Sequence, residues 1–168
     1  AQQGSFALFV AVESVLLAAT SGFGVAIARR ISHHGEQPAA LIGASVVACI
    51  GLGLVAAAAL AALSAWGGEA YRWLWLLALA APLMFVPPNL YGLWLGRGRM
   101  MALARLTVAP PALTLAALAL AWLAAGTHAL AAVLAAWAAA RLVVALGTLV
   151  AAWRGGWLGT PTRAALQG

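Results

Sequence analysis

Apolar residues fill five long stretches of this chain, and short polar or glycine-containing segments separate them. The stretches cover residues 5–27, 39–66, 71–95, 106–125 and 129–153. Each provides the roughly 20 residues that a helix needs to cross a hydrocarbon core of about 30 Å. The pattern predicts an all-α membrane protein. Five transmembrane helices form one bundle over residues 1–153, followed by a tail or truncated linker at 154–168.

Prolines interrupt the third and the fourth apolar stretches. Pro82, Pro87 and Pro88 lie inside the third stretch. Because proline removes a backbone donor and clashes with the preceding turn, we expect this helix to be kinked or locally broken. Pro110 and Pro111 lie near the predicted start of the fourth helix. A bending helix is useful in a transporter, although static bundles contain such helices as well.

The arginines are distributed unevenly between the two ends of the predicted helices. Seven lie at one end and Arg72 alone lies at the other. The seven are Arg29, Arg30, Arg97, Arg99, Arg105, Arg154 and Arg163. Basic residues favour the cytoplasmic segments of membrane proteins, so the pattern predicts an N-terminus outside and a cytoplasmic C-terminal tail. Tryptophans near the predicted helix ends agree with an aromatic belt at the headgroup level.

Composition excludes several other classes of protein. The chain is 65% hydrophobic and only 7% charged, whereas soluble domains are about 25% charged. The formal charge of +6 comes from arginines that flank apolar runs, so we expect anionic membrane lipids and not nucleic acid as partners. The chain begins with Ala and its first apolar run lacks the basic start of a signal peptide. We therefore expect a piece of a longer protein.

Two charged residues, Glu13 and Arg141, lie inside apolar stretches. A charge at the centre of a bilayer costs about 2.5–3.5 kcal/mol on insertion scales, so such residues normally face a cavity or a partner. At a rise of 1.5 Å per residue, Glu13 lies roughly 12 Å below the outer boundary and Arg141 roughly 20 Å below it. Their long side chains can bridge part of this offset if the two helices are neighbours.

Small or polar residues share a helical face with each of these charges. Thr20 follows Glu13 at i+7, and Thr148 follows Arg141 at i+7. This alignment favours a hydrated interior surface, and we take Arg141, Glu13, Thr20 and Thr148 as candidate substrate-binding residues. In this hypothesis Arg141 contributes positive charge to a cavity for an anionic substrate. The alternative is a structural ion pair with no transported ligand.

Two further patterns have simple structural explanations. His33 and His34 lie close to Glu36, but neighbouring histidines point in different directions and no further ligands follow, so a solvated cytoplasmic loop is expected and no metal site. Gly92 and Gly96 match the small-xxx-small spacing of helix contacts.

No catalytic constellation is present in the sequence. Three acids, no Asp and one cysteine, Cys49, in an apolar run leave no nucleophile–base pair. The phosphate-binding pattern GxxxxGK[ST] is also missing, so the chain itself does not hydrolyse ATP. We expect neither an enzyme nor a bound cofactor.

Two segments resemble a known family of membrane transporters. The run SFALFVAV at 5–12, continuing to SGFGVAIARRI at 21–31, resembles the second membrane helix of bacterial polysaccharide-repeat (O-antigen type) flippases, with its glycine-containing turn and basic exit. The run PNLYGLWLGRGR at 88–99 resembles the end of their fourth helix, and the two apolar stretches that follow resemble their fifth and sixth. Helices two to six of such a protein would start outside and end inside, as the arginine count also predicts.

The family belongs to the multidrug/oligosaccharidyl-lipid/polysaccharide exporter superfamily, whose members have two helical lobes around a central cavity. The resemblance implies a multi-pass protein of the bacterial plasma (inner) membrane. It would flip undecaprenyl-diphosphate-linked oligosaccharide to the outer leaflet for lipopolysaccharide or other surface polysaccharide synthesis, by alternating access. This chain would be a partial N-terminal lobe, without a first helix or the second lobe. The alternatives are an ion-coupled multidrug antiporter of the same superfamily and a non-transporting membrane assembly subunit.

Overall fold

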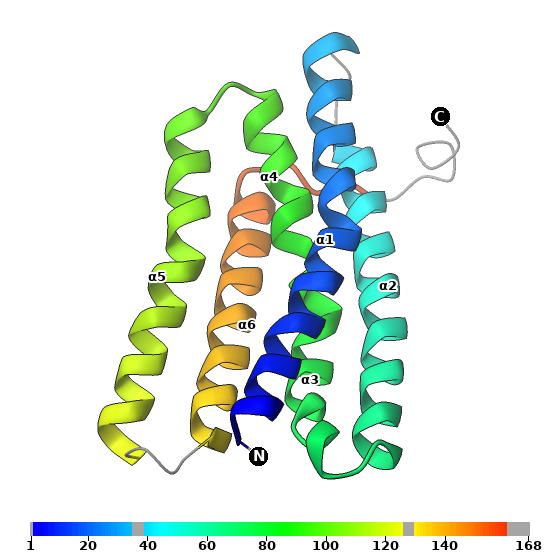
Figure 1. The fold of residues 1–168 in the computed structure, drawn as a ribbon. Helices are drawn as coiled ribbons and strands as arrows, with labels where there is room; N and C mark the ends of the chain where they lie inside the picture. The colour runs from blue at the N-terminus through cyan, green and yellow to red at the C-terminus, as the bar shows by residue number, and fades with distance from the viewer. Residues whose placement is uncertain (1, 35–38, 126–129, 161–168) are drawn as a thin grey trace.

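The computed structural model describes residues 2–34, 39–125 and 130–160, and every regular element in these ranges is a helix (Figure 1). The elements are α1 (Gln2–His34), α2 (Ala39–Trp66), the short 3₁₀ helix η1 (Glu69–Tyr71), α3 (Leu74–Met84), α4 (Val86–Gly96), α5 (Met100–Ala125) and α6 (Leu130–Arg154). The predicted loop at 35–38, the turn at 126–128 and Arg163 lie outside the described residues.

Four of the helical segments are long and apolar enough to cross a membrane. They are Ala39–Trp66, Leu74–Gly96, Met100–Ala124 and Leu130–Arg154. The prediction of an all-helical, multi-pass membrane protein is therefore confirmed. In α1 the described apolar part is Phe6–Ala18. The fifth span and the orientation of the termini stay predictions.

The break predicted in the third apolar stretch is confirmed. Helix α3 ends at Met84, α4 begins at Val86, and Phe85 lies between them. Pro87 and Pro88 open α4, where the first turn of a helix requires no N–H donor. The prolines thus divide one apolar stretch into two helices that continue in nearly the same direction (Figure 1).

Two helix boundaries differ from the sequence prediction. The fourth predicted helix was expected to begin at residue 106, but α5 begins at Met100 because the intervening Met, Ala, Leu and Arg residues are strong helix formers. Pro110 and Pro111 consequently lie inside the helix and not near its start. Helix α1 also continues through Ser32 to His34, residues predicted to lie in a loop.

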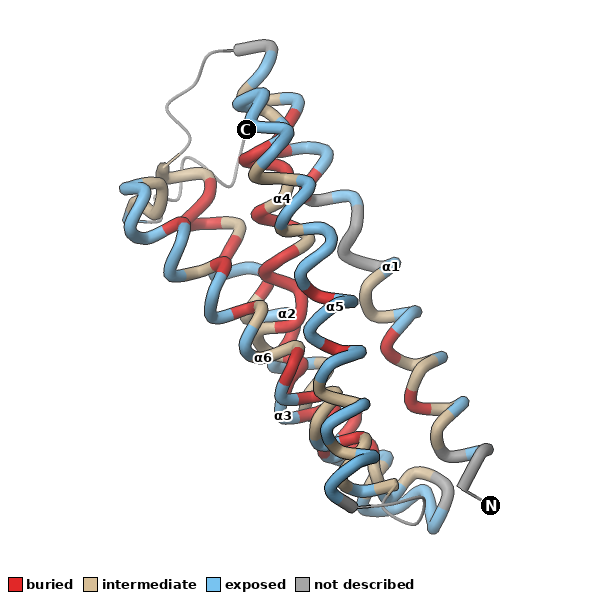
Figure 2. Tube along the Cα trace, turned by 90° about the vertical axis from the view of Figure 1, so that its left-hand side faces the viewer, coloured by how far each residue is buried: buried red, intermediate tan, exposed pale blue. Residues whose placement is uncertain are grey.

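The broken pair α3–α4 forms the centre of the bundle, and α5 lies at its edge (Figures 1 and 2). In the most apolar window of Leu74–Gly96, 72% of residues are buried, compared with 11% in Met100–Ala124. The exposed side chains of α5 are nevertheless mostly apolar, including Val108, Leu115 and Leu120. An apolar exterior around an apolar core is what a lipid environment requires.

Glycines allow α1 to pack closely against α4. A Cβ added at Gly92 would overlap the carbonyl group of Gly24, and one added at Gly96 would lie 2.9 Å from the Ile31 side chain. The small-xxx-small contact predicted for Gly92 and Gly96 is therefore confirmed, and its partner is α1. Because α1 carries Glu13, this contact also positions the acidic half of the candidate site.

The helix ends that carry arginines meet at one end of the bundle. The end of α1, the α4–α5 connection and the end of α6 lie together, opposite the N-terminus and η1 (Figure 1). Arg72 follows η1 at the other end. Among the described residues, Arg29, Arg30, Arg97, Arg99, Arg105 and Arg154 thus lie toward one end of the bundle and Arg72 lies at the other.

Candidate functional site

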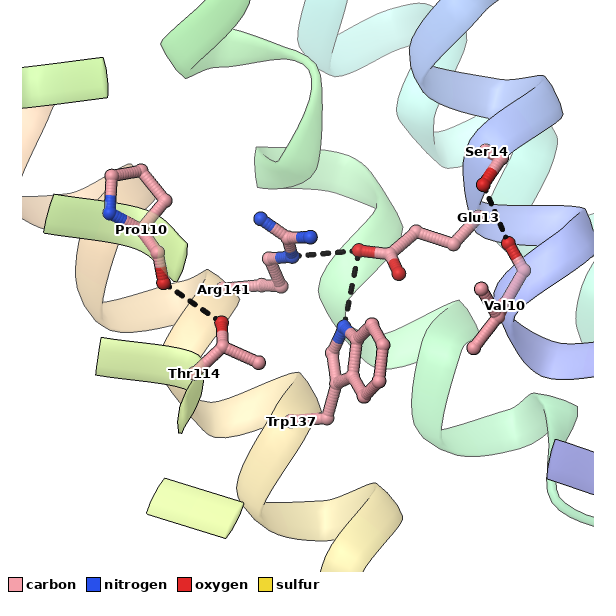
Figure 3. A network of polar contacts seen from close by, with 7 residues as sticks. All are labelled: Val10, Glu13, Ser14, Pro110, Thr114, Trp137 and Arg141. Carbon is pink, nitrogen blue, oxygen red and sulfur yellow. Dashed lines mark hydrogen bonds and ion pairs between the residues drawn. The ribbon is translucent and has the colours of Figure 1, made fainter. Parts of the chain in front are cut away.

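Glu13 and Arg141, the two charges inside apolar stretches, form an ion pair between α1 and α6. The Arg141 Nε–H donates to Glu13 Oε1 at 2.6 Å (Figure 3). The Glu13 side chain is 3% exposed and the Arg141 side chain is 25% exposed. The estimated difference in depth between the two residues is bridged by their side chains. A short, charge-assisted hydrogen bond of this kind is stronger than one between neutral groups.

Trp137 donates a second hydrogen bond to the Glu13 carboxylate. Its indole Nε1–H donates to the same Oε1 at 3.2 Å (Figure 3). Trp137 precedes Arg141 by one helical turn, so both donors project from one face of α6. Phe6 and Phe9 of α1 pack edge-on against the Trp137 ring, with centroid separations of 5.7 and 6.2 Å. Aromatic side chains of α1 therefore pack against the tryptophan that binds the carboxylate.

A cavity of about 220 Å³ lies beside the ion pair. Its lining comes from α1, α3, α4, α5 and α6: Leu17, Met84, Pro87, Pro88, Tyr91, Thr107, Pro110, Pro111, Arg141 and Val144. Four of these residues are prolines from the two proline-interrupted segments. The cavity thus forms where the broken helix pair and α5 meet, and Arg141 is the charged residue in its wall.

The hydrogen-bonding capacity of Arg141 is only partly used within the protein. Its Nε binds Glu13, and no hydrogen bond joins either terminal nitrogen to a residue in the described ranges. Both terminal nitrogens point away from Trp137 (Figure 3). The guanidinium group can therefore donate further hydrogen bonds into the cavity, while Glu13 balances its formal charge.

Tyr91 occupies a position in the cavity wall that the sequence reasoning missed. Its hydroxyl donates to the Leu106 carbonyl of α5 at 2.9 Å. That carbonyl lacks its usual partner because Pro110, four residues later, has no N–H. The sequence offered one clue to this contact: a proline inside a helix leaves the carbonyl four residues earlier free to accept a hydrogen bond from another helix. The clue was missed because the helix was predicted to begin only at residue 106.

The remaining candidate residues do not join this cluster in the described structure. Thr148 is buried, but its hydroxyl donates to the Ala145 carbonyl at 2.9 Å and does not line the cavity. Thr20 belongs to α1, and its side chain lies outside the described residues. The structure therefore brings together Glu13 and Arg141 from the predicted set.

Asn89 in α4 is a buried polar residue whose side chain interacts with the buried thiol of Cys49 in α2. Neither amide atom forms a hydrogen bond of full geometry to a described residue. A thiol is a weak hydrogen-bonding group, so the amide is only partly satisfied. Sequence reasoning did not single out this residue.

No protein-family model, no curated protein and no solved structure matches this chain. The resemblance to polysaccharide-repeat flippases therefore depends on the quoted sequence segments alone. Among the residues that the structure describes, no group of three or more His, Cys, Asp or Glu side chains could hold a metal ion. The side chains of His33 and His34 are not among those described.

Proposed function

We propose that this chain is the substrate-contacting part of a membrane transporter of the polysaccharide-repeat flippase type. Its substrate would be undecaprenyl-diphosphate-linked oligosaccharide, moved to the outer leaflet of the bacterial plasma membrane. The observation that carries this proposal is the cavity between proline-interrupted helices, in whose wall the two terminal nitrogens of Arg141 bind no described residue. The choice of substrate and membrane comes from the sequence resemblance.

The chemistry of Arg141 suits a phosphate-containing ligand. A guanidinium group presents N–H donors in a planar fork that matches the oxygens of a phosphate. The other residues of the cavity wall are mostly apolar, so Arg141 would be the main hydrogen-bond donor to a phosphate in the cavity. Low local polarity strengthens such a charge-assisted contact.

In the absence of substrate, the Glu13 carboxylate would take the place of the substrate's phosphate as the anionic partner of Arg141. In the described structure this carboxylate occupies the Nε–H of Arg141. Without that partner, a partly buried guanidinium would carry an uncompensated charge. A diphosphate that approached the free terminal nitrogens would share or replace this interaction, so that Arg141 is never left unpaired.

The cavity in this conformation is smaller than a typical ligand pocket. Its 220 Å³ lies below the roughly 300–1,000 Å³ of most small-molecule sites. It has room for a phosphate-sized group and not for a whole lipid-linked oligosaccharide. Transport would require opening, and the break at Phe85 with the prolines of α5 supplies points where the helices can bend.

The ion-coupled antiporter alternative would rely on Glu13 as the proton or cation carrier. In the described structure Arg141 and Trp137 both donate to the Glu13 carboxylate, so a coupling cation would have to displace these donors. The assembly-subunit alternative remains a direct competitor, because a structural ion pair would have the same geometry. These two explanations differ in what happens when both charges are removed.

The decisive experiment compares single and double neutral variants of the full-length protein in cells that lack the native copy. Surface polysaccharide would be measured per unit of membrane-inserted transporter, for Glu13→Gln, Arg141→Gln and the double variant Glu13→Gln/Arg141→Gln. The exposed Arg105→Gln serves as the charge-matched control. The proposal expects the double variant to insert normally and to lose at least about tenfold in transport, the loss of roughly one charged hydrogen bond.

A structural ion pair predicts a different pattern. The double variant, which removes both charges together, would then regain normal transport while the single variants remain impaired through poor insertion. Recovery of transport in the double variant would overturn the proposed role of Arg141.

A further inference from the structure

The arginine-rich end of the bundle holds a compact cluster that the cavity does not involve. The sequence Arg97-Gly98-Arg99 follows the end of α4, and Gly155-Gly156-Trp157 follows the end of α6. Each sequence places a glycine directly before a residue that can interact with a headgroup.

The end of α4 is closed by a glycine in the left-handed conformation. Gly98 has φ +65°, its N–H donates to the Leu95 carbonyl at 3.0 Å, and the Arg99 N–H donates to the Trp94 carbonyl at 3.0 Å. This is the Schellman arrangement, in which the residue after the glycine folds back over the last helical turn. It turns Arg99 toward the end of the bundle.

The end of α6 repeats the same arrangement. Gly156 has φ +67°, its N–H donates to the Trp153 carbonyl at 3.0 Å, and the Trp157 N–H donates to the Ala152 carbonyl at 3.0 Å. Trp157 therefore occupies the position on α6 that Arg99 occupies on α4. Arg99 and Trp157 are far apart in the sequence, but each is the residue that follows a left-handed glycine at a helix end.

These two helix ends bring both arginines to one tryptophan ring. The guanidinium carbon of Arg97 lies 4.9 Å from the Trp157 ring centroid, and that of Arg99 lies 5.7 Å from it. Trp94 packs edge-on against the same ring at 5.6 Å. We call Trp94, Arg97, Arg99 and Trp157 the Trp157 cluster.

The segment that carries Trp157 is anchored at two points. The Trp157 N–H bonds back to α6, and the Gly159 N–H donates to the Ala39 carbonyl of α2 at 2.9 Å. Trp157 is partly buried and packs with the core at this end of the bundle. The cluster is thus a preformed feature of three helix ends.

The cluster concentrates positive charge, and no carboxylate of the described residues balances it. In the described ranges, the ion pairs to carboxylates are Arg141–Glu13 and Arg72–Glu69, and neither involves Arg97 or Arg99. Arg72 makes a comparison within the chain: it stacks on Trp73 at 4.7 Å but has Glu69 at 3.8 Å. At the Trp157 cluster two exposed guanidinium groups converge, and no described residue pairs a carboxylate with them, so an anion from outside would relieve their repulsion.

We propose that the Trp157 cluster binds the phosphate group of an acidic membrane lipid. Its place at the ends of membrane-length helices puts the arginines and tryptophans at headgroup level. Next to the arginines, Leu95, Met100 and Met101 are exposed apolar side chains that would contact the lipid's acyl chain. A soluble phosphate has no apolar part that could contact these three side chains. The inference does not depend on the proposed transport function.

Native mass spectrometry of the full chain, released from a neutral detergent, can test this site. The protein would be titrated with palmitoyl-oleoyl phosphatidic acid, with palmitoyl-oleoyl phosphatidylcholine as the uncharged comparison. A basic residue near the surface contributes about fivefold in affinity for an acidic lipid. We expect Arg97→Gln/Arg99→Gln to weaken the first phosphatidic acid bound by about thirtyfold, and Trp157→Leu to weaken it as well.

Two controls remove the same charge elsewhere. Arg154→Gln lies at the same end, and Arg72→Gln removes the arginine that Glu69 already balances. Both should retain wild-type affinity, and circular dichroism should show unchanged helix content in every variant. Equal affinity of the double variant and the wild type would overturn the proposal. So would a fivefold or larger loss of affinity in Arg154→Gln, or displacement of the lipid by millimolar inorganic phosphate.

Discussion

At the scale of single residues, the candidate site is a charge pair whose two halves depend on each other. Glu13 is almost fully buried, and both donors that reach its Oε1 come from α6. Burial makes an unpaired charge expensive, whereas a neutral pair of similar shape is tolerated. The stability of the bundle should therefore respond more strongly to the loss of one partner than to the loss of both.

We expect Arg141→Gln to lower the free energy of unfolding by about 3 kcal/mol, because it leaves the Glu13 charge buried without a cation. The double variant Glu13→Gln/Arg141→Gln should recover most of this loss. Thermal unfolding in detergent micelles measures both. Additive losses in the double variant would contradict the coupling between the two side chains.

A second residue-scale prediction concerns Tyr91 and Pro110. Tyr91→Phe leaves the Leu106 carbonyl without a donor and should cost about 1 kcal/mol. In a Pro110→Ala background the backbone N–H at position 110 can bind that carbonyl, so Tyr91→Phe should then have little effect. A double-mutant cycle on the free energy of unfolding checks this. An equal cost of Tyr91→Phe in both backgrounds would refute it.

At the scale of helices, the α1–α4 contact depends on the absence of side chains at its glycines. A Cβ at Gly92 would meet the Gly24 backbone, whereas one at Gly22 of α1 would meet nothing within 4 Å. Backbone atoms cannot move aside as a flexible side chain can, so the two helices would have to separate.

Gly92→Ala should therefore destabilise the protein by about 1–3 kcal/mol through overpacking. Gly22→Ala should be neutral or slightly stabilising, because alanine favours the helix. Thermal unfolding of the two variants compares a glycine packed against another helix with an exposed helical glycine. A Gly92→Ala variant as stable as Gly22→Ala would mean that the helices are not packed this closely.

Helix boundaries illustrate how local and tertiary information differ. The prolines of the third apolar stretch correctly predicted a break, since Pro87 and Pro88 both lack the donor that a continuous helix needs there. The prolines of the fourth stretch suggested a helix start, but α5 continues through them. The hydroxyl of Tyr91, from another helix, supplies one of the missing hydrogen bonds. Local sequence could not reveal that partner.

At the scale of the whole molecule, the arginine pattern predicts an outside N-terminus and five crossings. The structure groups the described helix ends in agreement with this pattern, and the side that each end faces stays a prediction. The prediction to be tested is which helix ends face the outside of the cell and which face the cytoplasm.

Cysteine labelling in a Cys49→Ala background measures this directly. Gly4→Cys and Glu69→Cys should react with a membrane-impermeant maleimide in intact cells, whereas Met100→Cys should react only after permeabilisation. If α1 did not span, Gly4→Cys and Glu69→Cys would lie on opposite sides. Labelling of Met100→Cys alone in intact cells would invert the topology.

The sequence by itself determined the environment and the coarse architecture of this protein. Runs of about 20 mostly apolar residues satisfy their backbone groups in lipid only as helices, so the all-helical, multi-pass architecture follows from local composition. It also singled out Glu13 and Arg141, because charges in such runs need a partner. Tertiary structure decided that these two are each other's partners, that Trp137 joins them, and that Thr148 bonds to its own helix. It also placed Arg97 and Arg99 on Trp157. Each of these contacts joins residues distant along the chain or depends on how a side chain turns, and helical periodicity specifies a face but not the helix that packs against it.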